Sequence, residues 1–161
     1  MKFITAIIFI FTATMSQAWT SEAFNETMAA LRSVNIEVYN IPADQIQADT
    51  MGYIEYTHDE ANIYINPEMS FKDRSETLMH EAIHAIQWCI NPRLTETITA
   101  DMSNLKPFIS DETKLWAINL YDSSVYDIEM EAESFALQEW HWPDYTIVDQ
   151  IKYFCKGNIQ Q

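Results

Sequence analysis

The chain has little basic charge and almost no glycine. Nine of its 161 residues are Lys or Arg and 24 are Asp or Glu, which gives a formal net charge of −15 at pH 7. A surface this acidic excludes the basic face that nucleic acids and anionic membranes require, so we expect neither as a partner. Gly52 and Gly157 are the only glycines, which leaves tight turns to Asn, Asp and Pro.

A long apolar run occurs only at the N-terminus. Lys2 precedes the apolar residues Phe3 to Ala13, and Ser16-Gln17-Ala18 then places small residues at the two positions that a signal peptidase reads. We expect cleavage after Ala18, which leaves residues 19–161 as one exported domain without a membrane anchor. An uncleaved anchor is the alternative, but the run is short for a helix that spans a bilayer.

Cysteine is equally scarce, because Cys89 and Cys155 are the only two. In a chain that enters an oxidising compartment, two cysteines predict a disulfide bond. Two unpaired core thiols are the alternative, since a sequence does not show whether the geometry permits a bond.

The hydrophobic pattern changes along the chain from one helix and three short strands to a block of helices. The last two strands flank the polar turn His58-Asp59-Glu60, which is typical of a hairpin. This order predicts an α+β domain with a short antiparallel sheet. The expected helices are 21–31, 75–90, 111–120, 125–140 and 145–155, and the expected strands are 35–39, 51–57 and 61–65.

The motif His80-Glu81-Ala82-Ile83-His84 carries the clearest chemical information. Two histidines four residues apart lie one helical turn from each other on the same face, where both imidazoles can bind one zinc ion. Glu81 lies at the edge of that face and could act as general base, taking a proton from the attacking water. An ordinary polar helix face is the alternative. Helical projection separates an apolar arc, which we expect to face the core, from an arc that we expect to face a cleft and that contains His80, Glu81, His84, Gln87 and Trp88.

Other histidines offer less. Gln87 and Ile90 stand where a metzincin would have a glycine and a third histidine, so that class is rejected. His58 falls in the expected hairpin turn, and His141 follows an expected helix between two tryptophans. Neither has a supporting metal-binding pattern, so we expect a solvated loop residue and a surface residue.

An acidic cluster between residues 129 and 133 is the natural source of a third ligand. On a helix, Glu129 and Glu133 share a face with two alanines and two large apolar residues, whereas Glu131 lies on the opposite face. Charged groups on an inward face are costly unless they are paired or bind metal. We therefore expect Glu129 or Glu133 near the metal and Glu131 in a solvated stripe.

HExxH followed by Glu129-x-x-Ala132-x-x-Phe135-Ala136 resembles the pattern of small gluzincins, such as the phage-repressor-cleaving (ImmA/IrrE-type) peptidases. The resemblance covers about residues 61–136. It implies a small zincin-like domain in which an active-site helix packs against a glutamate helix. It also implies zinc bound by His80, His84 and Glu129, with Glu133 supporting the first ligand histidine. Those peptidases are cytosolic, whereas we expect this chain to be exported, so their substrate does not carry over. Their familiar glycine inside HExxH is also absent, since Ile83 stands in its place.

The resemblance to zincins has two further implications. The strand before the active helix, Ala61 to Asn66, would be an edge strand that pairs with an extended substrate; an ordinary hairpin strand is the alternative. Tyr126, one turn before Glu129, or else Tyr121, could donate to the oxyanion, with core packing as the alternative.

Taken together, these patterns predict an exported zinc peptidase, periplasmic or secreted, that acts on peptides or proteins. A non-catalytic zinc-binding domain that binds a partner is the second hypothesis. An exported helical adaptor without metal is the third. An intact Glu81 favours the first, because a structural zinc site needs no base.

Overall fold

The computed structural model describes residues 20–46, 51–57, 59–90, 115, 119, 131, 134 and 147–157. These residues form helices and a small sheet, so the predicted α+β class is confirmed. Residues 1–18, the expected signal peptide, lie outside the described part of the chain. The elements, in chain order, are α1 (Ser21–Arg32), β1 (Glu37–Asn40), β2 (Gly52–Tyr56), β3 (Ala61–Ile65), α2 (Phe71–Ile90) and α6 (Ile147–Phe154).

The three strands form a mixed sheet in the order β1-β3-β2. β2 and β3 pair antiparallel as the predicted hairpin, whereas β1 runs parallel to β3 and departs from the expected antiparallel sheet. β3 is therefore the central strand, and the expectation that residues 61–66 form an edge strand is wrong. Its three inward side chains, Ala61, Ile63 and Ile65, are all buried, which explains why β3 occupies the centre.

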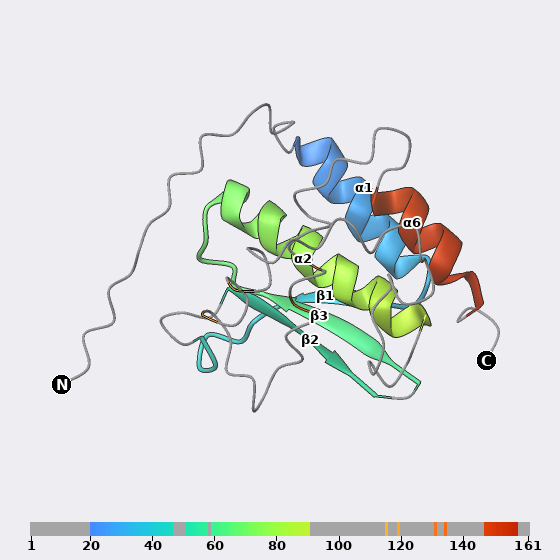
Figure 1. Cartoon of the computed structure of the whole chain (residues 1–161). Helices are drawn as coiled ribbons and strands as arrows, with labels where there is room; N and C mark the ends of the chain where they lie inside the picture. Colours follow the sequence, from blue (N-terminus) through green and yellow to red (C-terminus); the bar gives the residue numbers. More distant parts are fainter. Residues whose placement is uncertain are drawn as a thin grey trace.

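Helix α2 lies between the sheet and helices α1 and α6 (Figure 1). It contacts β2 and β3 on one side and α6 on another, while α1 contacts α6 and β1. The side chains between these layers are almost entirely aliphatic, and burial of this apolar area holds the layers together. The largest fully buried apolar ones are Leu31, Ile36, Ile63, Ile65, Leu78, Ile83, Ile86 and Ile151.

Side-chain caps define where the helices begin. The Thr20 hydroxyl accepts a hydrogen bond from the backbone N–H of Ala23 at 3.2 Å and starts α1. Ser70 caps α2 in the same way, because its Oγ accepts from the N–H of Asp73 at 3.2 Å and donates to the Asp73 carboxylate at 2.7 Å. This cap satisfies the Asp73 N–H, one of the groups that the first turn of a helix leaves open. It starts α2 at Phe71, four residues before the predicted start.

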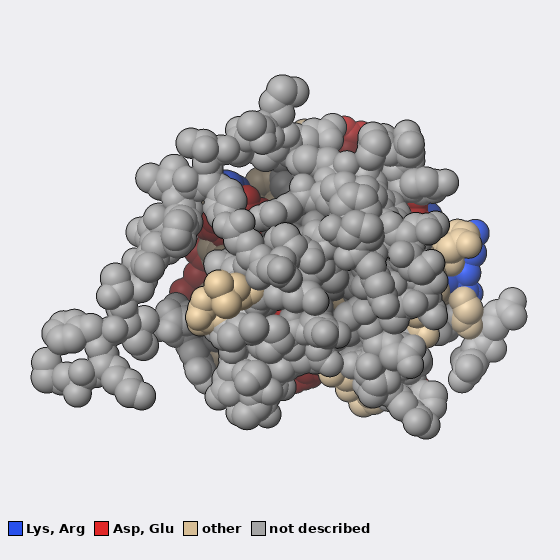
Figure 2. Space-filling view, viewed as in Figure 1, with Lys and Arg blue, Asp and Glu red and all other residues tan. Residues whose placement is uncertain are grey.

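A disulfide bond joins Cys89, near the end of α2, to Cys155, just after α6, and confirms the predicted pair. Disulfides are common in exported proteins. None of the helices in the described ranges is long and apolar enough to cross a membrane. On the face drawn in Figure 2, acidic side chains of described residues show at several places, while basic ones gather mainly at the right-hand edge, where α6 lies in Figure 1.

Candidate metal centre

The polar arc of α2 is buried, so the expectation that it faces an open cleft is wrong. Gln87 is 0% exposed, Glu81 6% and His84 8%, and His80 is half-buried. Trp88, on the same arc, donates its indole N–H to the backbone carbonyl of Thr57 at 2.8 Å. Burying a polar group costs free energy unless it has a partner, so the contacts of these side chains bear on what the arc does.

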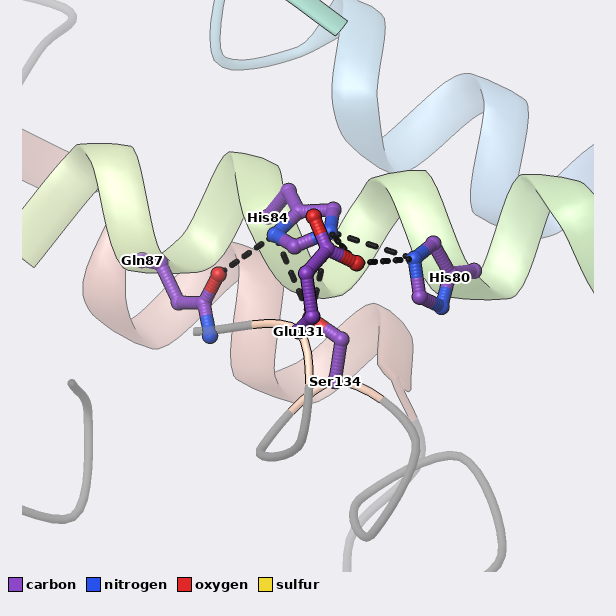
Figure 3. Close-up of polar contacts among 5 residues, drawn as sticks. All are labelled: His80, His84, Gln87, Glu131 and Ser134. Carbon is purple, nitrogen blue, oxygen red and sulfur yellow. Dashed lines mark hydrogen bonds and ion pairs between the residues drawn. The ribbon is translucent and has the colours of Figure 1, made fainter. Parts of the chain in front are cut away.

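His80 and His84 point toward one another from successive turns of α2, and Glu131 completes a triangle with them (Figure 3). The two Nε2 atoms are 3.1 Å apart. Oε2 of Glu131 lies 3.3 Å from Nε2 of His80 and 3.4 Å from Nε2 of His84. The three side chains thus bring two imidazole nitrogens and one carboxylate oxygen together from two separate parts of the chain.

The size of this triangle fits a metal ion. Zinc bonds of about 2.0–2.1 Å in tetrahedral geometry hold the ligand atoms about 3.3–3.4 Å apart. The observed edges of 3.1, 3.3 and 3.4 Å match one face of such a tetrahedron. Imidazole and carboxylate donors also suit divalent transition metals. His80, His84 and Glu131 therefore form a group that could hold a metal ion.

Glu131 corrects the helical projection, which assigned it to a solvated stripe. Its side chain is 8% exposed and faces the two histidines. Ser134, also helical and one turn further on, is 0% exposed and lies against His84. The projection assigned the face of Glu131 and Ser134 to solvent, but polar side chains on α2 supply partners for both residues, so this face is buried. The alanine-rich face that it took as the inward one lies outside the described residues.

Several predicted residues lie outside the described part of the chain. They are Glu129 as third ligand, Glu133 as its support, Tyr126 and Tyr121 as oxyanion donors, and the two remaining histidines, His58 and His141. Their roles stay predictions.

The electrostatic interactions in the cluster favour a negative carboxylate on Glu131 and a positive charge on His84. Burial alone would raise the pKa of Glu131, but the hydrogen bonds with His80 and His84 and the charges of both rings hold this pKa at about 2. Burial also disfavours charge on His84, yet the hydrogen bond to Glu131 and the charge of Glu81 outweigh it and raise the pKa of the imidazole. Opposite charges this close stabilise the charged form of each partner.

Glu81 lies beside the cluster on the side of strand β2. Burial raises the pKa of its carboxyl group, and the two neighbouring histidines offset only part of that effect. A Cβ atom placed on Gly52 would lie 3.7 Å from Cγ of Glu81, so the glutamate packs directly against β2. A buried carboxyl group with a raised pKa is suited to accept a proton near neutral pH.

Two further side chains contact the cluster and were missed by sequence reasoning. The carboxamide oxygen of Gln87 lies 2.6 Å from Nδ1 of His84. The hydroxyl oxygen of Ser134 lies 3.2 Å from Nδ1 and 3.4 Å from Nε2 of the same ring. The signal for Gln87 was its position three residues after His84, which places both on one helix face. For Ser134 the sequence held no comparable signal.

The chain has no match among protein-family models, curated proteins or solved structures. What the protein does must therefore be inferred from the geometry and electrostatics of this centre.

Proposed function

We propose that the protein is an exported zinc peptidase whose metal is held by His80, His84 and Glu131. The observation that carries the proposal is the donor triangle, whose edges of 3.1, 3.3 and 3.4 Å have the size of a tetrahedral face, built on an HExxH helix. Two nitrogens and one oxygen form the donor set typical of catalytic zinc, which leaves one coordination position open. Glu131 thus takes the role that the gluzincin pattern gives to Glu129.

Zinc at such a centre polarises a carbonyl group and lowers the pKa of a water molecule. The chain's own contribution is the proton transfer. Glu81 is buried and its pKa is raised, so its carboxylate is more basic than an exposed one and would accept the proton of the attacking water. It would then return this proton to the leaving amine. The low pKa of Glu131 keeps the ligand carboxylate ionised at any physiological pH.

The substrate class follows from the strand beside Glu81. Among the described residues, β2 is hydrogen-bonded only to β3, on one side. An extended peptide could add to its other edge through backbone hydrogen bonds. Gly52 at the start of β2 lies next to Glu81, so a peptide on this edge would run past the general base. We therefore expect peptides or unfolded protein segments as substrates. β2 would pair with them, in the role that the sequence predicted for β3.

A non-catalytic metal domain that binds a partner is the second candidate, and the burial of the centre favours it. His84 and Glu131 are each 8% exposed, which is typical of a closed structural site. Structural zinc sites, however, have four protein ligands, and the described residues supply three. In a closed structural site, the buried Glu81, which is not one of the three proposed ligands, would also have no role.

Zinc binding and peptide turnover should be measured together on the purified, oxidised protein. We expect one zinc ion per chain and zinc-dependent cleavage of a mixed peptide library. Glu81→Gln should retain zinc and lose nearly all turnover, since it removes only the base. Glu68→Gln, an exposed glutamate before α2, is the matched control and should behave as the wild type. Zinc binding without turnover would leave the second candidate, and absence of zinc binding would leave the metal-free adaptor.

A further inference from the structure

Gln87 is an uncharged polar side chain in the most deeply buried part of α2. It is 0% exposed, although an aliphatic side chain at this position would gain from burial where an amide does not. A buried amide is retained where its hydrogen bonds fix one arrangement of the neighbouring side chains. The contact with His84 shows which neighbour Gln87 orients.

The carboxamide oxygen of Gln87 lies 2.6 Å from Nδ1 of His84 (Figure 3). A carbonyl oxygen only accepts hydrogen bonds, so the imidazole nitrogen must be the donor. The neutral ring then carries its proton on Nδ1 and has a lone pair on Nε2. Nε2 is the atom that lies 3.1 Å from Nε2 of His80 and 3.4 Å from Oε2 of Glu131.

Glu131 and Ser134 also lie beside the ring. The Glu131 carboxylate faces Nε2 of His84 at 3.4 Å, a longer contact than the 2.6 Å between Gln87 and Nδ1, and Ser134 does not distinguish the two nitrogens. Its hydroxyl lies at 3.2 Å from Nδ1 and 3.4 Å from Nε2, so the two nitrogens are almost equivalent for it. A hydroxyl can also donate or accept, whereas the oxygen of Gln87 can only accept. Gln87 makes the shortest of these contacts and accepts from Nδ1 alone, so it favours the proton of His84 on Nδ1 over the longer contact of Nε2 with Glu131.

We propose that Gln87 is a positioning residue that fixes the Nδ1–H tautomer of His84 and so keeps Nε2 available as a metal donor. The use of that donor rests on the proposed function, whereas the tautomer itself does not. Gln87 stands three residues after His84, so the two lie on one helix face. From there the Gln87 carboxamide reaches Nδ1 of the His84 ring.

The test is the proton position on His84 in metal-free protein labelled with ¹⁵N-histidine, measured by long-range ¹H–¹⁵N correlation in alkaline solution, where the ring is neutral. The wild type should have a proton on Nδ1 of His84 and none on Nε2. In Gln87→Met the preference should be lost, and zinc affinity should fall by about 10–100-fold. Gln87→Glu retains an acceptor oxygen and should restore the Nδ1–H tautomer.

Ser134→Ala is the matched control, because it removes a polar neighbour that lies at almost equal distances from the two ring nitrogens, and it should leave the tautomer unchanged. A wild-type spectrum with the proton on Nε2 overturns the inference without any variant, so it remains testable even if Gln87→Met does not fold. An unchanged tautomer in folded Gln87→Met also overturns it. If the tautomer is as expected but the wild type binds no zinc, the proposed function fails and the role of Gln87 in orienting the proton stands.

Discussion

A Cβ atom on Gly52 would lie 2.5 Å from Cγ2 of Thr77, so strand β2 and helix α2 approach each other at a distance that only glycine allows. The same Cβ would lie 2.9 Å from the backbone oxygen of Tyr64, which cannot move without disturbing the sheet. This contact sets how closely β2 packs against Glu81.

Gly52→Ala should therefore destabilise the protein by about 1–3 kcal/mol, the usual cost of overpacking. Urea unfolding of the metal-free, disulfide-intact protein measures it. Thr77→Ser removes Cγ2. The Gly52→Ala/Thr77→Ser double variant should therefore recover part of the stability that Gly52→Ala loses. Gly157→Ala is the matched control, because its added Cβ would meet no atom within 4 Å. If the effects of Gly52→Ala and Thr77→Ser on the free energy of unfolding simply add, the contact between these residues is not the cause of the destabilisation.

The carboxylate ligand can be identified by zinc titration of three single variants. Glu131→Ala should lose more affinity than the roughly 10–100-fold expected for a supporting residue, because it removes one of three donors. Glu129→Ala and Glu133→Ala are the comparisons, and each should lose less affinity than Glu131→Ala. If Glu129→Ala proves the most damaging, the gluzincin pattern identifies the ligand correctly and Glu131 has a supporting role.

The pH dependence of stability should report the ion pair between Glu131 and the histidines in the metal-free protein. The pKa of Glu131 is about 2 in the folded state against 4.5 ordinarily, so the folded state binds its proton less readily than the unfolded state. Its stabilising contribution is therefore complete above the ordinary pKa and is lost as pH falls from 4.5 toward 2.

Glu131→Gln should be less stable than the wild type at pH 6, and this difference in the free energy of unfolding should shrink steadily below pH 4.5. Denaturant unfolding at a series of pH values measures it. A difference that does not change with pH would contradict the assigned pairing.

The disulfide should supply a large share of the stability. Cys89 and Cys155 are separated by 66 residues, and closing a loop of this length is worth about 4 kcal/mol in the chain-entropy model. The Cys89→Ala/Cys155→Ala double variant should unfold at a correspondingly lower urea concentration. The double variant under oxidising and reducing conditions is the control and should behave identically in both. Equal stability of oxidised and reduced wild type would contradict the prediction.

Local sequence patterns predicted the features that depend on neighbours along the chain. The periodicity of residues 21–31 matches α1, the hairpin strand 61–65 matches β3, and HExxH places both histidines on one face. The start of α2 was missed because the cap Ser70-x-x-Asp73 was not weighed.

Features set by tertiary partners were not predictable in this way. The parallel pairing of β1 depends on which edge of β3 is available, and that is decided by the whole sheet. Glu131 faces inward because imidazoles on α2, 47 and 51 residues earlier in the sequence, provide partners for it. A single-helix projection contains no information about such partners, so it assigned Glu131 to the solvated side.

The contact between His80 and Glu131 closes a loop of 51 residues, and the disulfide closes another that overlaps it, because Cys89 falls inside the first loop and Glu131 inside the second. Contacts this distant in sequence carry a large loop-closure entropy, so the centre depends on the rest of the fold being formed. An unfolded chain has no preformed site, and an ion that binds only the native state stabilises it in proportion to the logarithm of its concentration. Metal supply in the compartment where the chain folds would then determine how long each molecule resists unfolding and proteolysis.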